Sequence, residues 1–229
     1  GLADMGHILV FCEGHSGQLK RSSIELLTLA AKSGNEFSAI CIGQDAKKLA
    51  ASAGHFGARE AFVSEDPGFA LYNPEAYTAF VSEIVSQTKP DFVLASASAL
   101  ARDLFPRVGA RCKAAVASDC THLELSQGTF KVIKPIYSGK CFAEVAFQNS
   151  PTKIILMRAN QLPVTTADTS KNTKITEKPS GSLSLKTLVQ EVVKGTSEKL
   201  DLTEANIIVS GGRGLKEASN FKLLSDLAE

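Results

Sequence analysis

The residues best suited to chemistry form a glycine-rich segment near the carboxyl end, Ser210-Gly-Gly-Arg-Gly214. Adjacent glycines let backbone amides approach a phosphate without a side-chain clash. The guanidinium of Arg213 is planar and permanently charged, so it can pair with a phosphate or stack on a flat ring. Gly211, Gly212 and Arg213 are therefore the candidate cofactor-binding residues. The same residues would also make a plain turn with an arginine at the surface.

The residues around this segment predict how it is positioned. Apolar residues at 207–209 precede the glycines and indicate a strand, and residues 221–228 have apolar positions at helical spacing. A strand, a glycine turn and a helix start form the unit with which α/β proteins hold phosphates.

No other stretch has the pattern of a catalytic or metal site. The sequence lacks the G-x-S-x-G, Walker and H-E-x-x-H motifs. Its four histidines, at 7, 15, 55 and 122, have no metal-ligand spacing, and its five cysteines include no C-x-x-C pair and are expected to be reduced and buried. We therefore predict no catalytic and no metal-binding residues. His15, in a Gly-His-Ser-Gly loop, is the best single candidate outside the glycine segment, and it could equally be a solvated loop histidine.

Composition limits the class of partner. The 229 residues are 44% hydrophobic and 21% charged, as in folded globular proteins. A formal net charge of +1 gives no reason to expect nucleic acid or an anionic membrane surface. The apolar runs are far shorter than a membrane span, and the first residues lack the features of a signal peptide, so we expect no insertion into a membrane.

Apolar runs and helical patterns alternate along the first hundred residues. Runs at 7–13, 37–42, 60–63 and 91–95 are typical of strands buried on both faces. Between them lie predicted helices at 22–32, at 45–53 and from Asn73, the first with Ile24, Leu27 and Ala31 on its buried face. This alternation predicts an α/β fold with a mostly parallel open sheet and helices on both faces.

The helix after the run at 91–95 carries Arg102, Asp103 and Arg107, with Pro106 among them. Open α/β sheets place their sites at the carboxyl ends of strands, so these charges could form a ligand or partner surface. They could equally be the solvated start of a helix whose small residues permit close packing.

The rest of the chain is β-rich and then polar. Runs at 120–125, 130–137 and 140–147, joined by turn residues at 127–128 and 138–139, predict that the end of the sheet is antiparallel or mixed. Another strand is expected at 153–158, and residues 163–184 have the composition of an extended, poorly packed connector. We therefore divide the chain into an α/β domain at 1–162, a connecting and wrapping segment at 163–203 and the start of a second domain at 204–229.

Residues 209–216 and 220–224 resemble the start of the FAD domain in the electron-transfer flavoprotein alpha subunit. Residues 8–13, 101–107 and 134–139 resemble other parts of that family, in the same order along the chain. The resemblance implies a nucleotide-hydrolase-like α/β domain followed by a second α/β domain that holds FAD. It also implies that Arg213 contacts FAD, with Gly211 and Gly212 shaping the loop.

The resemblance implies an electron carrier without substrate chemistry of its own. Such a subunit pairs with a beta subunit that carries AMP, and its FAD passes electrons from acyl-CoA dehydrogenases of fatty acid β-oxidation, or from other dehydrogenases, to a quinone oxidoreductase or another acceptor. It would be located in the bacterial cytoplasm, or in the mitochondrial matrix of a eukaryote. The family's Q-T-G and S-G-x-x-Q-H segments are absent from the 229 residues. We therefore expect a chain truncated early in its FAD domain, with FAD binding lost.

Two alternatives from other classes remain. The first domain could bind AMP or ATP at its own strand ends and act as a sensing module. It could also be a scaffold whose main task is a subunit interface, with no ligand of its own.

Overall fold

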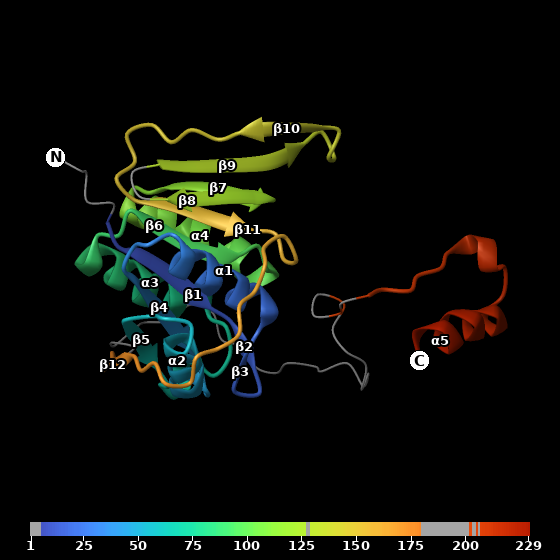
Figure 1. The fold of residues 1–229 in the computed structure, drawn as a ribbon, viewed down its shortest axis with the longest axis horizontal. Helices are drawn as coiled ribbons and strands as arrows, with labels where there is room; N and C mark the ends of the chain where they lie inside the picture. Colours follow the sequence, from blue (N-terminus) through green and yellow to red (C-terminus); the bar gives the residue numbers. More distant parts are fainter. Residues whose placement is uncertain (1–5, 127–128, 180–201, 203–204, 206) are drawn as a thin grey trace. The chain divides into compact units, whose positions relative to one another are not determined.

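A sheet of seven parallel strands forms the centre of the first of two units in this computed structural model (Figure 1). The structure describes residues 6–126, 129–179, 202, 205 and 207–229, and the units are Gly1–Val192 and Val193–Glu229. The strand order is β12-β5-β4-β1-β6-β11-β7, and every neighbouring pair is parallel. The strands are β1 (Ile8–Cys12), β4 (Phe37–Ile42), β5 (Glu60–Ser64), β6 (Phe92–Ser96), β7 (Ala115–Cys120), β11 (Lys153–Met157) and β12 (Lys174–Glu177).

Helices cover both faces of this sheet, as the sequence predicted. Alternate residues of a strand point to opposite faces, and β1 accordingly contributes to two cores. Val10 packs in the core with α1 (Arg21–Lys32) and α2 (Ala46–Gly54), whereas Phe11 packs in the core with α3 (Pro74–Thr88) and α4 (Ala99–Cys112). The Phe11 and Phe105 rings meet edge to face with centroids 5.3 Å apart.

The buried face of α1 differs from the predicted one. Leu27 is buried as expected, but Ala31 is exposed and Ile24 is only partly buried, while Leu26 and Ala30 enter the core. The helix is rotated because it also buries the carboxylate of Glu25, which is hydrogen-bonded to a neighbouring loop. Hydrophobic spacing alone could not reveal this polar contact.

The caps of α3 and α4 follow from their sequences. The Asn73 side chain accepts hydrogen bonds from the amides of Glu75 and Ala76 at 3.1 and 3.0 Å, which satisfies two donors at the start of α3. Ser98 likewise accepts from the Ala101 amide at 3.0 Å. Pro106 lies inside α4 without ending it.

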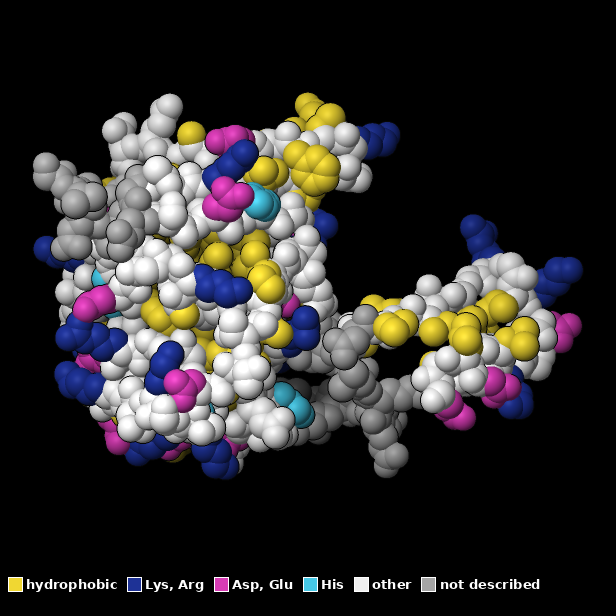
Figure 2. All heavy atoms as spheres, in the orientation of Figure 1, with side chains coloured by type: hydrophobic (Ala, Val, Ile, Leu, Met, Phe, Trp, Pro, Cys, Tyr) yellow, Lys and Arg dark blue, Asp and Glu magenta, His cyan; other side chains and the backbone are white. Residues whose placement is uncertain are grey.

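The antiparallel strands form sheets of their own, so the prediction that they extend the main sheet is wrong. A three-stranded sheet contains β8 (His122–Ser126), β9 (Thr129–Ile136) and β10 (Cys141–Glu144), and a two-stranded one contains β2 (Gly14–His15) and β3 (Gln18–Leu19). Asp119, at φ 60°, lies at the end of β7, where the chain leaves the parallel sheet. The turn predicted at 138–139 is present, and the one at 127–128 lies outside the described residues. Figure 2 shows hydrophobic side chains gathered around the turn end of β9 and β10.

The segment predicted as a poorly packed connector contains β12, which pairs in parallel with β5. The Lys174 amide donates to the Arg59 carbonyl at 3.0 Å, and the Lys178 amide donates to the Val63 carbonyl at 2.9 Å. A short polar strand can join a sheet because its backbone groups, not its side chains, make the pairing. Residues 180–184 of the predicted connector lie outside the described part of the chain, and the predicted boundaries at 162 and 203 stay predictions.

The second unit contains short turns and one helix within its described residues. They are 3₁₀ turns at Arg213–Leu215 and Ala218–Phe221 and the helix α5 (Lys222–Ala228). Residues 207–209 do not form the predicted strand, and Ile207 is 84% exposed. A strand needs a neighbour for its backbone groups, and residues 207–209 pair with none of the described residues. Across the described ranges, no helix has both the length and the apolar character needed to cross a bilayer.

Candidate functional site

The glycine-arginine loop is a tight turn on the surface of the second unit. Arg213 begins the 3₁₀ turn, in which the Leu215 amide donates to the Gly212 carbonyl at 3.0 Å. A Cβ atom on Gly211 would lie 2.4 Å from Leu215 Cδ1 and 2.6 Å from Leu224 Cδ1, so the close packing of these leucines requires glycine there. A Cβ atom added to Gly212 would have no neighbouring atom within 4 Å.

This loop presents positive charge to the solvent. Arg213 is exposed, and within the described residues its guanidinium makes no ion pair. The exposed guanidinium of Arg213 follows Gly212, which has open space beside its backbone. This combination suits an anionic or flat cofactor group. The loop's 3₁₀ turn is a single turn of three residues, so it supplies little of the dipole that a long helix would offer.

A hollow of about 460 Å³ lies at the carboxyl ends of β1, β4 and β6. The chain builds the sheet outward from β1 in one direction through β4 and β5 and then returns to the other side of β1 with β6. Such a switch point is where open α/β sheets bind ligands. The lining includes Gly14, Ser16 and Gly17 but not His15, which lies exposed on β2. His15 is therefore beside this hollow rather than in its wall.

A carboxylate occupies the part of the hollow where a phosphate would be expected. Ser98, the cap of α4, donates its hydroxyl to Glu13 Oε2 at 2.7 Å. A helix start favours an anion, and here Glu13 supplies one. Tyr77 also lines the hollow, and its pKa is raised to about 12 by burial and by the charge of Glu13. A second anion such as a phosphate would be repelled by this arrangement.

The charged residues of α4 are partly joined to one another. Arg107 pairs with Asp103 at 2.9 Å, and the Tyr72 hydroxyl donates to Asp103 at 2.7 Å. The Arg107 hydrogen bond, followed by that of Tyr72, lowers the pKa of Asp103, while burial raises the pKa of Tyr72. Arg102 is not part of this cluster; its charge acts on Asp119 instead. Tyr72 was missed by sequence reasoning because its partner lies 31 residues away.

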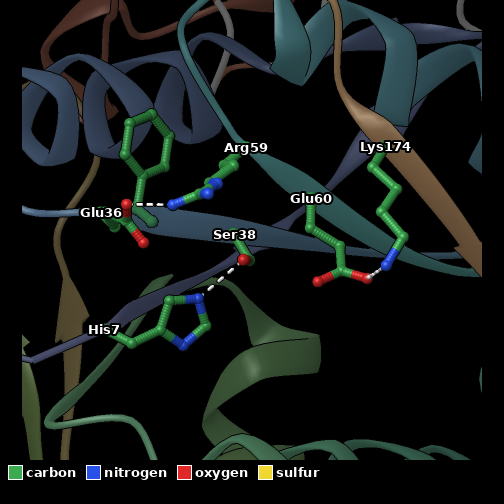
Figure 3. A pocket seen from close by; sticks show the side chains of 7 residues that line it. His7, Glu36, Ser38, Arg59, Glu60 and Lys174 are labelled. Atoms are coloured by element: carbon green, nitrogen blue, oxygen red, sulfur yellow. Dashed lines mark hydrogen bonds and ion pairs between the residues drawn. The ribbon is translucent and has the colours of Figure 1, made fainter.

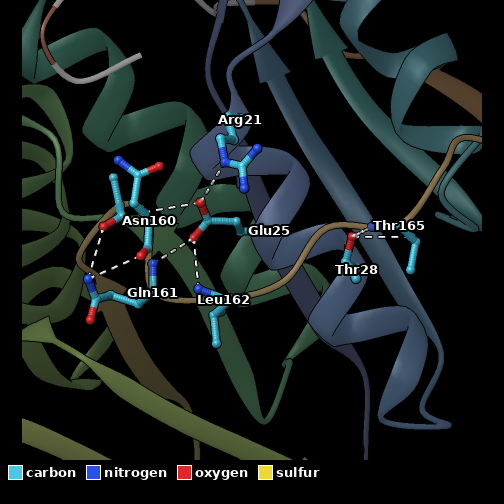
Figure 4. A network of polar contacts seen from close by, with 8 residues as sticks. Arg21, Glu25, Thr28, Asn160, Gln161, Leu162 and Thr165 are labelled. Carbon is cyan, nitrogen blue, oxygen red and sulfur yellow. Dashed lines mark hydrogen bonds and ion pairs between the residues drawn. The ribbon is translucent and has the colours of Figure 1, made fainter. Parts of the chain in front are cut away.

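A second residue that sequence reasoning missed is Glu25 of α1, shown in Figure 4. Its buried carboxylate accepts hydrogen bonds from the amides of Asn160, Gln161 and Leu162 at 3.1, 3.2 and 3.2 Å. Arg21 lies beside it at 3.7 Å. Farther along α1, the Thr28 hydroxyl accepts from the Thr165 amide at 3.2 Å. These contacts fasten the chain to α1 after it leaves β11.

A second pocket, of about 490 Å³, lies at the amino ends of β4 and β5, the end of the strands opposite to the hollow (Figure 3). Its charges are paired across β4, β5 and β12. Arg59 pairs with Glu36, Lys174 pairs with Glu60 at 3.1 Å, and His7 Nε2 lies 2.6 Å from the Ser38 hydroxyl. Burial lowers the pKa of His7, and the Thr176 hydroxyl lowers that of Glu60. The contacts of Glu60 with Lys174 and Thr176 join β12 to β5, whereas the other two pairs join segments at the starts of β1, β4 and β5.

The cysteines and acidic residues form no metal site within the described ranges, where no group of three or more candidate ligands occurs. Cys12, Cys41 and Cys120 are buried, whereas Cys141 is exposed, contrary to the expectation that all would be buried. Cys141 begins β10, a strand in which every residue except Ala143 is exposed.

The amino-acid sequence of this chain is similar to those of several known proteins. The family model described as "Electron transfer flavoprotein domain" matches residues 8–182. The electron transfer flavoprotein subunit alpha of Bacillus subtilis (strain 168) is 32% identical over 97% of the chain and 69% of that protein. Protein FixB of Clostridium saccharobutylicum is 31% identical over 100% of the chain and 70% of that protein. The acryloyl-CoA reductase electron transfer subunit beta of Anaerotignum propionicum is 26% identical over 92% of the chain and 66% of that protein.

Proposed function

The chain belongs to the electron transfer flavoprotein family, and from that premise we propose that it is the alpha-type subunit of an FAD-dependent electron carrier. The observation that carries the proposal is the family match over residues 8–182 together with similarity to alpha subunits along nearly the whole chain. In this proposal the subunit forms a heterodimer with a beta subunit that carries AMP. It receives electrons from acyl-CoA or other dehydrogenases and passes them to a quinone oxidoreductase or another acceptor, without substrate chemistry of its own.

The relatives named above are bacterial proteins, which supports a cytoplasmic location as part of the proposal. Since the protein would act as a carrier, its task is to bind the cofactor, orient it and set its potential.

Arg213 is the proposed contact with FAD, supported by its exposed guanidinium and by the open backbone of Gly212. FAD supplies the redox chemistry when it is bound. A fixed positive charge near a group that gains electrons stabilises the added negative charge, and Arg213 would thereby raise the reduction potential. Gly211 keeps the turn compact, since any side chain there would collide with Leu215 and Leu224.

The test uses the alpha subunit made at the full length of its relatives, together with its beta subunit, as wild type, Arg213→Ala and Arg213→Lys. We expect Arg213→Ala to weaken FAD binding about tenfold or more, the loss of a hydrogen bond to a charged group, and to lower the flavin potential. Arg213→Lys keeps the positive charge, so its flavin reduction potential should stay close to that of the wild type. Its FAD affinity should be lower, because lysine lacks the planar fork of donors. Fluorescence titration measures the affinity and a dye-coupled reductive titration measures the potential. Unchanged values in Arg213→Ala would remove this residue from the site.

The alternative of a nucleotide sensor is less well supported. The hollow at the switch point has a suitable position and volume, but Glu13 in its wall already places a carboxylate at the start of α4. Lys20 is the cation among the lining residues, and the other lining carboxylate, Asp45, is paired with Lys48 at 3.0 Å. The scaffold alternative is compatible with the carrier, because an alpha subunit must also hold its partner.

A further inference from the structure

The three-stranded sheet ends in a free edge. β10 is paired with β9 on one side only, and no described strand lies on its other side. The Val145 amide donates to the Val132 carbonyl at 2.9 Å, and the pairing continues with Ala143 opposite Lys134. Residues of an antiparallel strand alternate between facing the partner strand and facing away. Phe142 and Glu144 therefore direct their amides and carbonyls away from β9.

The same edge carries the most exposed aromatic side chains of the first unit's described residues. Tyr137, in the turn, is 75% exposed, and Phe142 is 68% exposed. Phe142 lies opposite Pro135 in the register, and the next pair is Glu144 and Ile133. Pro135 and Ile133 are half-buried, so Phe142 extends an apolar strip across the outer face of β9 and β10. Figure 2 shows hydrophobic side chains gathered at the turn end of this hairpin.

The charges around this strip are predominantly positive. Lys131 pairs with Glu144 at 4.0 Å, and Arg158 pairs with Asp119 at 2.7 Å. Lys134 and Lys140 have no ion-pair partner in the described part of the chain. An edge with free backbone groups, exposed aromatic rings and unpaired lysines complements an extended segment with apolar side chains and flanking carboxylates.

We propose that β10 is the docking edge for the beta subunit, which adds an extended strand with flanking acidic residues alongside Phe142 and Glu144. This inference rests on the proposed function for the existence of that partner, and it adds the surface and the mode of contact. Exposed flat edges are normally protected from pairing by charge, twist or cover. One edge strand of the large sheet, β12, has such protection, since its Lys174 and Glu177 are both held in ion pairs. At Phe142, β10 carries an exposed aromatic ring in place of such paired charges.

The experiment measures binding of the purified chain to the beta subunit from the same organism by calorimetry. Phe142→Ser removes the ring, Glu144→Pro removes an outward amide together with the carboxylate that pairs with Lys131, and Lys140→Glu reverses a charge. We expect each to weaken binding, Phe142→Ser by about tenfold or more because buried aromatic anchors dominate interfaces. Leu71→Ser, at another exposed apolar side chain, and Lys32→Glu, at another exposed lysine, are matched controls that should bind as wild type.

Amide exchange of the complex tests strand addition separately from side-chain contact. Because Ala143 already pairs with β9, only the amides of Phe142 and Glu144 should gain protection when the partner binds. If the wild type binds and all three variants bind equally well, the docking edge is wrong while the heterodimer stands. If the wild type does not bind, the heterodimer itself is wrong. If the chain self-associates and Phe142→Ser makes it monomeric, a second copy occupies the edge instead.

Discussion

Individual residues show how one side-chain type serves different ends. Arg213 is exposed and pairs with no acidic side chain of the described residues, whereas Arg107 and Arg158 are each held by an aspartate. Such exposed pairs contribute about 0–1 kcal/mol each, so the aspartates orient these arginines more than they stabilise the fold. Arg213 therefore differs from the paired arginines in keeping its full fork of donors available.

His7 gives a prediction at this scale. Its pKa lies below the ordinary value of 6.5 because burial disfavours the charged ring, although Glu36, Glu60 and Asp91 partly oppose this. His7 therefore binds a proton more readily in the unfolded chain than in the folded chain. The free energy of unfolding falls as the pH drops through 6.5 toward the lower pKa of the folded state. We expect the free energy of unfolding in urea to decline as the pH falls through 6.5, and less steeply in His7→Gln.

The control for this measurement is His15→Gln, since His15 is exposed on β2. The free energy of unfolding of His15→Gln should decline with falling pH as steeply as that of the wild type. An identical slope in His7→Gln and in the wild type would mean that other groups cause the decline.

Elements of this fold are held in place by contacts that cross large distances in sequence. The segment after β11 crosses α1 and then reaches β12, and Glu25 and Thr28 fasten it on the way. The last described pairing of this segment with the sheet is the Lys178 amide on Val63. The anchored part of the segment thus extends beyond the predicted boundary at 162 and as far as the edge of the sheet.

Removing the Glu25 carboxylate should loosen this crossing. Glu25→Ala removes the buried carboxylate that accepts from the amides of Asn160, Gln161 and Leu162, which costs about 1–3 kcal/mol. Denaturant unfolding measures the loss, and amide exchange should show it at residues 160–162. Glu36→Ala removes an exposed pairing with Arg59 and should cost less than about 1 kcal/mol. Equal losses in the two variants would show that Glu25 has no special role.

The whole molecule places its two candidate ligand regions in different units. The hollow at the switch point belongs to the first unit, and the glycine-arginine loop belongs to the second. The first has the position of a nucleotide site but contains Glu13, and the second has the charge for an anion but is open to solvent. Neither region alone provides the enclosed, partly apolar pocket that holds a cofactor tightly.

Calorimetry on the 229-residue chain alone tests this view. We expect AMP, ATP and FAD each to bind with Kd no tighter than roughly 1 mM, a free energy near −4 kcal/mol. Micromolar binding of AMP or ATP that is strengthened in Glu13→Gln would favour the sensing module. Micromolar binding of FAD would show that these residues suffice for the cofactor.

The sequence by itself determined the features that depend on local pattern. Apolar runs and helical spacing predicted the strands and helices as far as α4, and Asn73 predicted the start of a helix. Residues 209–216, with 220–224 and three earlier segments, indicated the family, whose model matches residues 8–182. These signals are local because side-chain periodicity and turn chemistry act within a few residues.

Only the tertiary structure decided which segments pair. It placed β12 beside β5, separated β8, β9 and β10 from the parallel sheet, and gave residues 207–209 no strand partner among the described residues. It also turned Glu25 inward to loop amides more than a hundred residues away along the chain. Backbone hydrogen bonds carry no side-chain signature, and a buried carboxylate in a helix has the same local pattern as a solvated one. Such choices are made by the neighbours that folding brings together.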